Sequence, residues 1–148
     1  MANKVVYENL LKKKINELKK YNEIIPEPKV IDGSRLDFLL KSKGEKSCFI
    51  EVKSSTLSRI PNISEFPDSV TSRGSKHLSL LTNLKNDGFR AIQIYLIQRN
   101  DTNCFKIAKD IDHQYFKSFQ IAKKSGVEIL ILQSLISYNG IELSKKRL

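Results

Sequence analysis

Two short apolar stretches near the start of the chain, each interrupted by a few charged residues, predict two neighbouring β-strands. The first covers Arg35–Lys41 and the second covers Ser47–Ser54. The polar segment Ser42–Lys46, which contains Gly44, lies between them. A short polar linker with glycine between two strands is typical of a hairpin. We therefore expect an antiparallel pair whose side chains alternate between two faces.

Other segments carry apolar residues at helical spacing, which predicts three helices. Helix-capping residues such as threonine, serine or aspartate mark the expected starts, and glycine marks the expected stops. The expected bounds are Asn3–Tyr21 with the stripe Leu11, Ile15 and Leu18, then Thr71 or Ser72 to the stop at Asn86–Gly88, then Asp112–Gly126.

Two further strands, Ala91–Gln98 and Val127–Gln133, are predicted around the last helix. An order of strand, helix, strand, helix and strand favours parallel crossovers, because a parallel pair needs a long connection. We therefore predict an α/β fold with a mixed central sheet flanked by helices. The segment Leu57–Val70, with two prolines, is predicted to be a long loop. A short hairpin or edge strand is expected around Asn139–Gly140.

Length and composition indicate one globular domain spanning residues 1–148. The chain has 148 residues, of which 40% are hydrophobic, enough for a sizeable core. It has two cysteines and no CxxC pair, which argues against a disulfide framework and a cysteine zinc site. The sequence shows neither a membrane-spanning apolar run nor a signal peptide. We expect a cytoplasmic protein that does not bind membranes.

The charge of the chain changes the picture of its partners. Lysine and arginine number 26 against 16 aspartates and glutamates, which gives a formal net charge of +10. Such an excess favours polyanions, and nucleic acid is the leading candidate because phosphate contacts release counterions. A lysine-rich surface that serves only solubility is the alternative.

The two predicted strands carry a group of residues suited to metal-dependent chemistry. Asp37 and Glu51 supply hard oxygen ligands for Mg²⁺ or Mn²⁺, and the Val52 carbonyl is a candidate third ligand. Lys53 projects from the same face as Glu51 and is the candidate catalytic lysine for phosphodiester hydrolysis. Glu8 falls on the stripe of the first helix, so it is expected to face the site, unless it only complements the helix dipole.

Candidate contacts to nucleic acid lie at two other places. Arg73, Lys76 and His77 share the start of the second helix, where backbone N–H groups already favour phosphate. A solvated charged face, with His77 partly buried, is the alternative. Gln98 ends a strand and is expected to reach the site, or else simply to meet water.

These residues resemble the PD-(D/E)xK nuclease superfamily and, more narrowly, the sugar fermentation stimulation protein A family. The resemblance implies a DNA-binding protein linked to regulation of sugar metabolism, with a restriction-endonuclease-like fold. It also assigns Asp37, Glu51 and Lys53 to core positions of the superfamily, and Glu8 to its helix acid. The resembling stretches are Ser34–Leu40, Glu51–Ser54, Phe66–Thr71, Arg73–Leu78, Gln98–Asp101 and Gly126–Glu128.

Two departures from the family pattern affect what the resemblance implies. Family members usually carry an N-terminal OB-like domain, and this chain begins where we expect that domain to have ended. Weaker DNA affinity, or a separate OB-like partner, is therefore implied. Ile107 and His113 stand where the pattern has prolines, which affects local loop shape.

Three hypotheses for function remain at this point. The first is a Mg²⁺-dependent deoxyribonuclease, and the second is a DNA-binding regulator that keeps the nuclease fold without turnover. An RNA-processing factor shares the same electrostatics. Homodimers are typical of such nucleases, but no interface is legible in the sequence.

Overall fold

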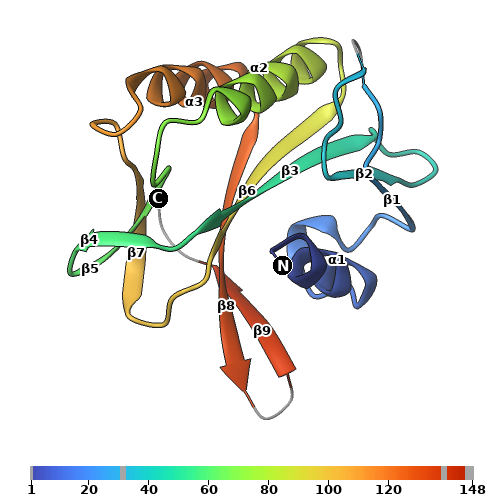
Figure 1. The fold of residues 1–148 in the computed structure, drawn as a ribbon. Coiled ribbons are helices and arrows are strands. Elements are labelled where there is room, and N and C mark those ends of the chain that lie inside the picture. The colour runs from blue at the N-terminus through green and yellow to red at the C-terminus, as the bar shows by residue number, and fades with distance from the viewer. Residues whose placement is uncertain (1, 31–32, 138–139, 146–148) are drawn as a thin grey trace.

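The fold is built on a six-stranded mixed sheet (Figure 1). The computed structural model describes residues 2–30, 33–137 and 140–145. The central strands of this sheet pair in parallel, whereas the outer strands pair antiparallel. Across the sheet the order is β1 (Glu23–Pro26), β2 (Phe38–Lys41), β3 (Cys48–Ser55), β6 (Arg90–Ile97), β8 (Glu128–Ser137) and β9 (Gly140–Lys145).

Helices cover both faces of this sheet. Helix α1 (Ala2–Leu11) lies on one side, and α2 (Ser72–Asn86) and α3 (His113–Ser125) lie together on the other (Figure 1). Successive residues of β3 point to opposite faces, so Ile50 packs in the core under α1 and Phe49 packs in the core under α2 and α3. The predicted α/β class, with a mixed central sheet flanked by helices, is confirmed.

The predicted hairpin and the two later helices are also confirmed. Strands β2 and β3 pair antiparallel, with Phe38 opposite Ile50. Thr71 caps α2 through a hydrogen bond from Gly74 N to its hydroxyl, and Asp112 caps α3 by accepting from Tyr115 N. Gly126 ends α3 at φ 102°, a conformation that favours glycine. A terminal hairpin of β8 and β9 is present, although Asn139 lies outside the described residues.

The first helix is shorter than predicted. It ends at Leu11, which is 56% exposed and is therefore not part of an inward stripe. Lys13 adopts φ 54°, a left-handed conformation that a helix does not contain. The chain then turns into a short 3₁₀ helix, Asn16–Leu18, and this turn lets Ile15 and Leu18 reach the core under α1.

The segment predicted as a long loop instead forms part of a second sheet. Residues Leu57–Ile60 (β4) and Asn62–Phe66 (β5) make a hairpin, and β5 pairs in parallel with β7 (Thr102–Ile107), which was not predicted. Pro61 occupies the turn, so it interrupts no ladder. Strand β1 was also missed, and Pro26 is tolerated there because β1 lies at the edge of its sheet.

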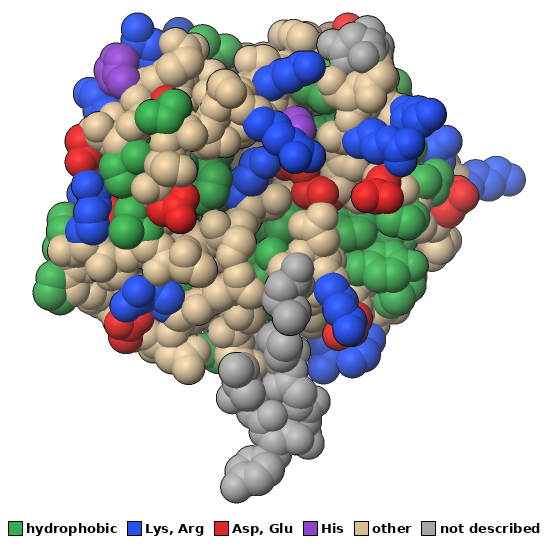
Figure 2. Space-filling model, in the orientation of Figure 1, with side chains coloured by type: hydrophobic (Ala, Val, Ile, Leu, Met, Phe, Trp, Pro, Cys, Tyr) green, Lys and Arg blue, Asp and Glu red, His purple; other side chains and the backbone are tan. Residues whose placement is uncertain are grey.

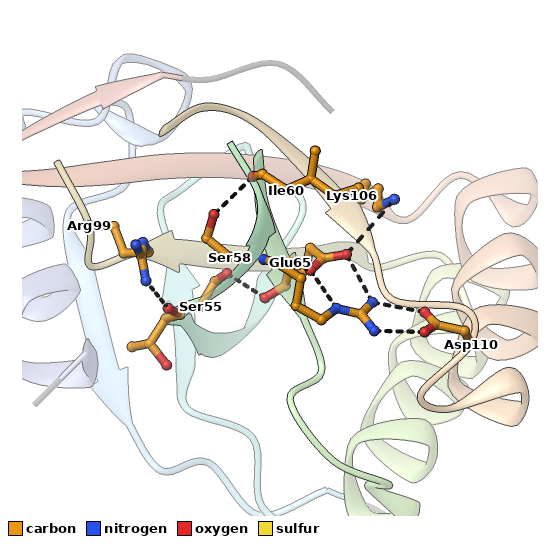
Figure 3. Close-up of polar contacts among 9 residues, drawn as sticks. Ser55, Ser58, Ile60, Glu65, Arg99, Lys106 and Asp110 are labelled. Atoms are coloured by element: carbon orange, nitrogen blue, oxygen red, sulfur yellow. Dashed lines mark hydrogen bonds and ion pairs between the residues drawn. The ribbon is translucent and has the colours of Figure 1, made fainter. Parts of the chain in front are cut away.

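A buried acid holds the second sheet together (Figure 3). Glu65 on β5 is 1% exposed and accepts hydrogen bonds at both oxygens from the guanidinium of Arg59 on β4, at 2.8 and 3.0 Å. Arg59 also binds Asp110, and Lys106 Nζ lies 3.8 Å from Glu65 Oε1. The pKa of Glu65 is therefore lowered, chiefly by its hydrogen bonds to Arg59.

Candidate metal and nucleic-acid site

The two predicted metal ligands, Asp37 and Glu51, lie side by side. Strands β2 and β3 pair Phe38 with Ile50, and the same register continued by one residue places Asp37 opposite Glu51. Asp37 is half-buried and sits just before β2. Its Oδ2 accepts a hydrogen bond from Val52 N at 2.7 Å, and its Oδ1 accepts one from Asn3 Nδ2 at 2.6 Å.

The neighbouring carboxylate changes the titration of Asp37. Burial raises the pKa of Asp37 to about 7, and the hydrogen bond and negative charge of Glu51 add to this rise. The hydrogen bonds from Val52 and Asn3 lower the pKa but do not offset the rise. Two acids forced together in this way favour a proton or a cation between them.

Glu51 is the more deeply buried of the two acids. It is 3% exposed, and within the described residues its Oε2 has ion-pair contacts but receives no hydrogen bond of good geometry. Lys53 Nζ lies 3.7 Å from this oxygen, and His77 Nδ1 also lies against it. A buried carboxylate that lies beside a second carboxylate is a suitable ligand for a cation.

His77 belongs to this acidic site rather than to the outer surface of α2. It is 6% exposed, and its Nδ1 lies 3.0 Å from Lys53 Nζ. Burial lowers the pKa of His77 to about 4, and the positive charges of Lys53 and Arg73 lower it further. At neutral pH the ring is therefore uncharged, in line with the alternative of a buried histidine, and the contact of His77 with nucleic acid stays a prediction.

The rim above the site is basic. Arg73 and Lys76 are exposed on the first turns of α2, and both are close enough to lower the pKa of His77. Figure 2 shows this face, with acidic side chains near its centre, a histidine and several Lys or Arg side chains above them, and hydrophobic side chains beside them. This arrangement suits a polyanion that approaches the acids from the α2 side.

Two predicted site residues lie elsewhere. Glu8 is exposed, because the buried face of α1 is formed by residues such as Val5 and Val6, and Asn3 is the residue of this helix that reaches Asp37. Gln98 accepts a hydrogen bond from the Ser54 hydroxyl. Ser54 follows Lys53 in an extended strand, so this pair lies on the sheet face opposite the lysine.

Sequence reasoning missed Gln93, a polar residue inside β6. Gln93 is fully buried beside Glu51 in the parallel register. Its Nε2 donates to the carbonyls of Glu51 and Ile94, both at 3.2 Å, while its Oε1 has no partner among the described residues. A glutamine within an otherwise apolar strand was the available signal, because a buried amide normally satisfies all its polar atoms.

The residues present fit a hard divalent cation that keeps several water ligands. No group of three or more His, Cys, Asp or Glu side chains converges on one point within residues 2–30, 33–137 and 140–145. Two carboxylates and the Val52 carbonyl are the protein ligands on offer, and Mg²⁺ commonly uses one or two carboxylates plus water. The position of the buried Glu51 carboxylate beside Asp37 supports this fit.

The described helices do not include one long and apolar enough to cross a membrane.

Comparison with known proteins gives a consistent set of relatives. Residues 1–140 match the family described as the sugar fermentation stimulation protein RE domain. Sugar fermentation stimulation protein homologs from Ruegeria pomeroyi and Roseobacter denitrificans are each 44% identical over 97% of this chain, covering 63% and 61% of their own lengths. The chain thus spans about three fifths of the length of these relatives.

A solved structure shows the same fold. It is described as SfsA from Pyrococcus furiosus in complex with Ca²⁺. It is 28% identical, with a TM-score of 0.85, and the match covers 97% of this chain and 61% of that chain.

Proposed function

The chain belongs to the sugar fermentation stimulation protein family, matching its RE domain, and from this premise we propose that it binds DNA and hydrolyses phosphodiester bonds with a divalent metal. The observation that carries the proposal is the pair of neighbouring carboxylates, Asp37 and the buried Glu51, which face each other across two paired strands. The relative crystallised with Ca²⁺ supports a divalent cation. We assign Mg²⁺ or Mn²⁺ as the working ion, because the ligands are hard oxygens.

Each residue of the site has a role in this proposal. Asp37, Glu51 and the Val52 carbonyl would hold the cation, which would supply positive charge at the phosphate. The Lys53 ammonium stabilises the negative charge that develops on the phosphate. His77 is uncharged at neutral pH, and its Nδ1 lies against both the Lys53 ammonium and the Glu51 carboxylate, so the ring helps to position these two groups.

The DNA backbone is held from the α2 side in this account. Arg73 and Lys76 are exposed at the start of α2, where helix N–H groups also favour phosphate. The formal net charge of +10 adds a general attraction for polyanions. From the relatives' names we further propose that DNA binding serves regulation of sugar metabolism, with a homodimer or an OB-like partner as candidate assemblies.

A cleavage assay tests the proposed reaction. Single-stranded, duplex and branched DNA are incubated with wild type, Lys53→Ala and Lys43→Ala in Mg²⁺, Mn²⁺ or EDTA. We expect metal-dependent cleavage that falls about 100-fold or more in Lys53→Ala. Lys43, exposed on the turn between β2 and β3, is the matched control and is expected to keep full activity. Equal cleavage by wild type and Lys53→Ala contradicts the assignment.

A second candidate is a DNA-binding regulator without turnover. The observation that favours it is that no group of three or more His, Cys, Asp or Glu side chains converges on one point among the described residues. In that case wild type binds DNA in a salt-sensitive manner and cleaves none of the substrates in either metal. The same assay therefore separates the two candidates.

A further inference from the structure

A cavity of about 260 Å³ opens beside the acidic pair, on the side of α1. Its wall includes Asn3, Lys4 and Tyr7 from α1, Pro26 and Glu27 at the end of β1, and Asp37. Asp37 thus borders both the cavity and Glu51. A ligand that reaches the two carboxylates can place its neighbouring group in this cavity.

The aromatic wall of the cavity is held in a fixed orientation. The ring of Tyr7 stacks on that of Phe38, with ring centres 5.8 Å apart and planes within 6° of parallel. Phe38 is buried in the core, whereas Tyr7 is only partly buried. Tyr7 therefore offers a rigid apolar side chain to a flat ligand, which keeps the entropy cost of binding low.

Polar and charged groups surround this apolar surface. Glu27 adopts φ 50°, a left-handed backbone conformation that residues other than glycine rarely adopt. Its backbone N–H donates a hydrogen bond to the Asp37 carbonyl at 2.9 Å. Such backbone outliers cluster at ligand sites. Lys4 is exposed at the cavity and carries the positive charge that a phosphate needs.

The flat apolar ring of Tyr7, the polar groups around it and the positive charge of Lys4 together match the chemistry of a nucleotide. We propose that this cavity binds one unstacked nucleobase adjacent to the phosphate at Asp37 and Glu51, with Tyr7 packing against the base and Lys4 contacting a neighbouring phosphate. This inference rests on the proposed function and gives its substrate class. Bases within an intact duplex are paired and stacked, so the site selects single-stranded or frayed DNA.

Binding of short DNA in Ca²⁺, measured by fluorescence anisotropy, tests the subsite. Three proteins are compared: wild type, Tyr7→Leu, which keeps an apolar contact with Phe38 but removes the ring, and Tyr7→Phe, which keeps the ring. We expect Tyr7→Leu to weaken single-strand binding about 5- to 100-fold, with little change for duplex, and Tyr7→Phe to resemble wild type. Circular dichroism confirms that each variant is folded.

Two further arms sharpen the result. Lys4→Ala is expected to weaken single-strand binding, whereas Lys14→Ala, an exposed lysine outside the cavity wall, leaves it unchanged. In the second arm, a series of single strands carries one abasic nucleotide at successive positions. One of these positions is expected to weaken binding by wild type, whereas binding by Tyr7→Leu is expected to be the same for every position.

The subsite and the proposed function fail in different ways. If wild type binds DNA but Tyr7→Leu keeps the same ratio of single-strand to duplex affinity, only the base subsite is overturned. If wild type binds no DNA with or without metal, both proposals are overturned.

Discussion

Placing Asp37 beside Glu51 lowers the stability of the metal-free protein when Asp37 is ionised. Asp37 has a pKa of about 7 in the folded protein, above its ordinary value of 3.8. Between about pH 4 and about pH 7, the folded state therefore binds the Asp37 proton more tightly than the unfolded state does. The free energy of unfolding consequently falls as pH rises through this range. Ionised Asp37 lowers the stability of the metal-free protein above that window.

Asp37→Asn is consequently expected to stabilise the metal-free protein at about pH 8. The gain is about 1–2 kcal/mol after discounting for partial exposure, or roughly 2–8 °C in Tm. The gain shrinks at about pH 4.5, where the wild-type carboxyl is already protonated. Thermal unfolding followed by circular dichroism in EDTA at both pH values measures this effect.

Asp110→Asn is a control, because the pKa of Asp110 is shifted in the opposite direction to that of Asp37. The hydrogen bond from Arg59 lowers the pKa of Asp110 to about 2, so its charge favours the folded state above its ordinary pKa. Neutralising it is expected to leave Tm unchanged or lower it slightly. A Tm of Asp37→Asn at or below that of wild type at about pH 8 would contradict the account of the acidic pair.

At the scale of the elements, the second sheet depends on one buried ion pair. Arg59→Ala removes the guanidinium and leaves the buried carboxylate of Glu65 with the backbone N–H of residue 59, at 3.3 Å, and with Lys106 Nζ, at 3.8 Å. Breaking a buried pair from one side is strongly destabilising, but Arg59 is itself 40% exposed, so we expect a loss of about 2–3 kcal/mol. Urea unfolding of the variant measures this loss.

The double variant Arg59→Ala with Glu65→Leu identifies the cause. It removes the stranded charge as well as its partner, and it is expected to recover part of the stability that Arg59→Ala removes. If the double variant is less stable than Arg59→Ala alone, the buried charge is not what destabilises the single variant.

The sequence predicted those features that depend on residues close together in the chain, such as strand alternation, the short hairpin and helix caps. Asp37, Glu51 and Lys53 could be placed together because strand alternation and a short hairpin fix their relative positions. The helix from Thr71 to Asn86 was also legible from its cap and stop. The end of α1 at Leu11 was not, because it depends on Ile15 and Leu18 turning back to the core, which is a tertiary effect.

Other features depend on how elements pack, and local patterns do not contain that information. His77 was assigned to the right helix, but its contact with Glu51 follows from how α2 is rotated over the sheet. Strands β4 and β5 were hidden because Pro61 and Pro67 are typical of loops, whereas here they stand in a turn and after a strand. Gln93 was read as part of an apolar strand.

For the molecule as a whole, the net charge predicts how DNA binding responds to salt. Removing one side chain that binds a phosphate reduces the slope of log K against log salt by about 1. Arg73→Ala combined with Lys76→Ala is therefore expected to reduce the slope by roughly 2, with weaker binding to all sequences. Filter binding or anisotropy over a range of NaCl concentrations measures the slope.

Lys43→Ala combined with Lys46→Ala is the matched control for charge. Both lysines are exposed on the turn between β2 and β3 rather than at the start of α2. Their removal is expected to leave the slope almost unchanged. Equal slopes for the two double variants would show that binding follows overall charge rather than the rim of α2.

The most direct test of the central claim is calorimetric titration of Mg²⁺ and Mn²⁺ into wild type and Glu51→Gln. Glutamine keeps the shape of the side chain and removes the charge that the claim requires. We predict one binding event per chain in wild type and none in Glu51→Gln, with both proteins folded by circular dichroism. Binding of equal affinity in both proteins, or no binding in wild type, would contradict the claim that Asp37 and Glu51 form a metal site.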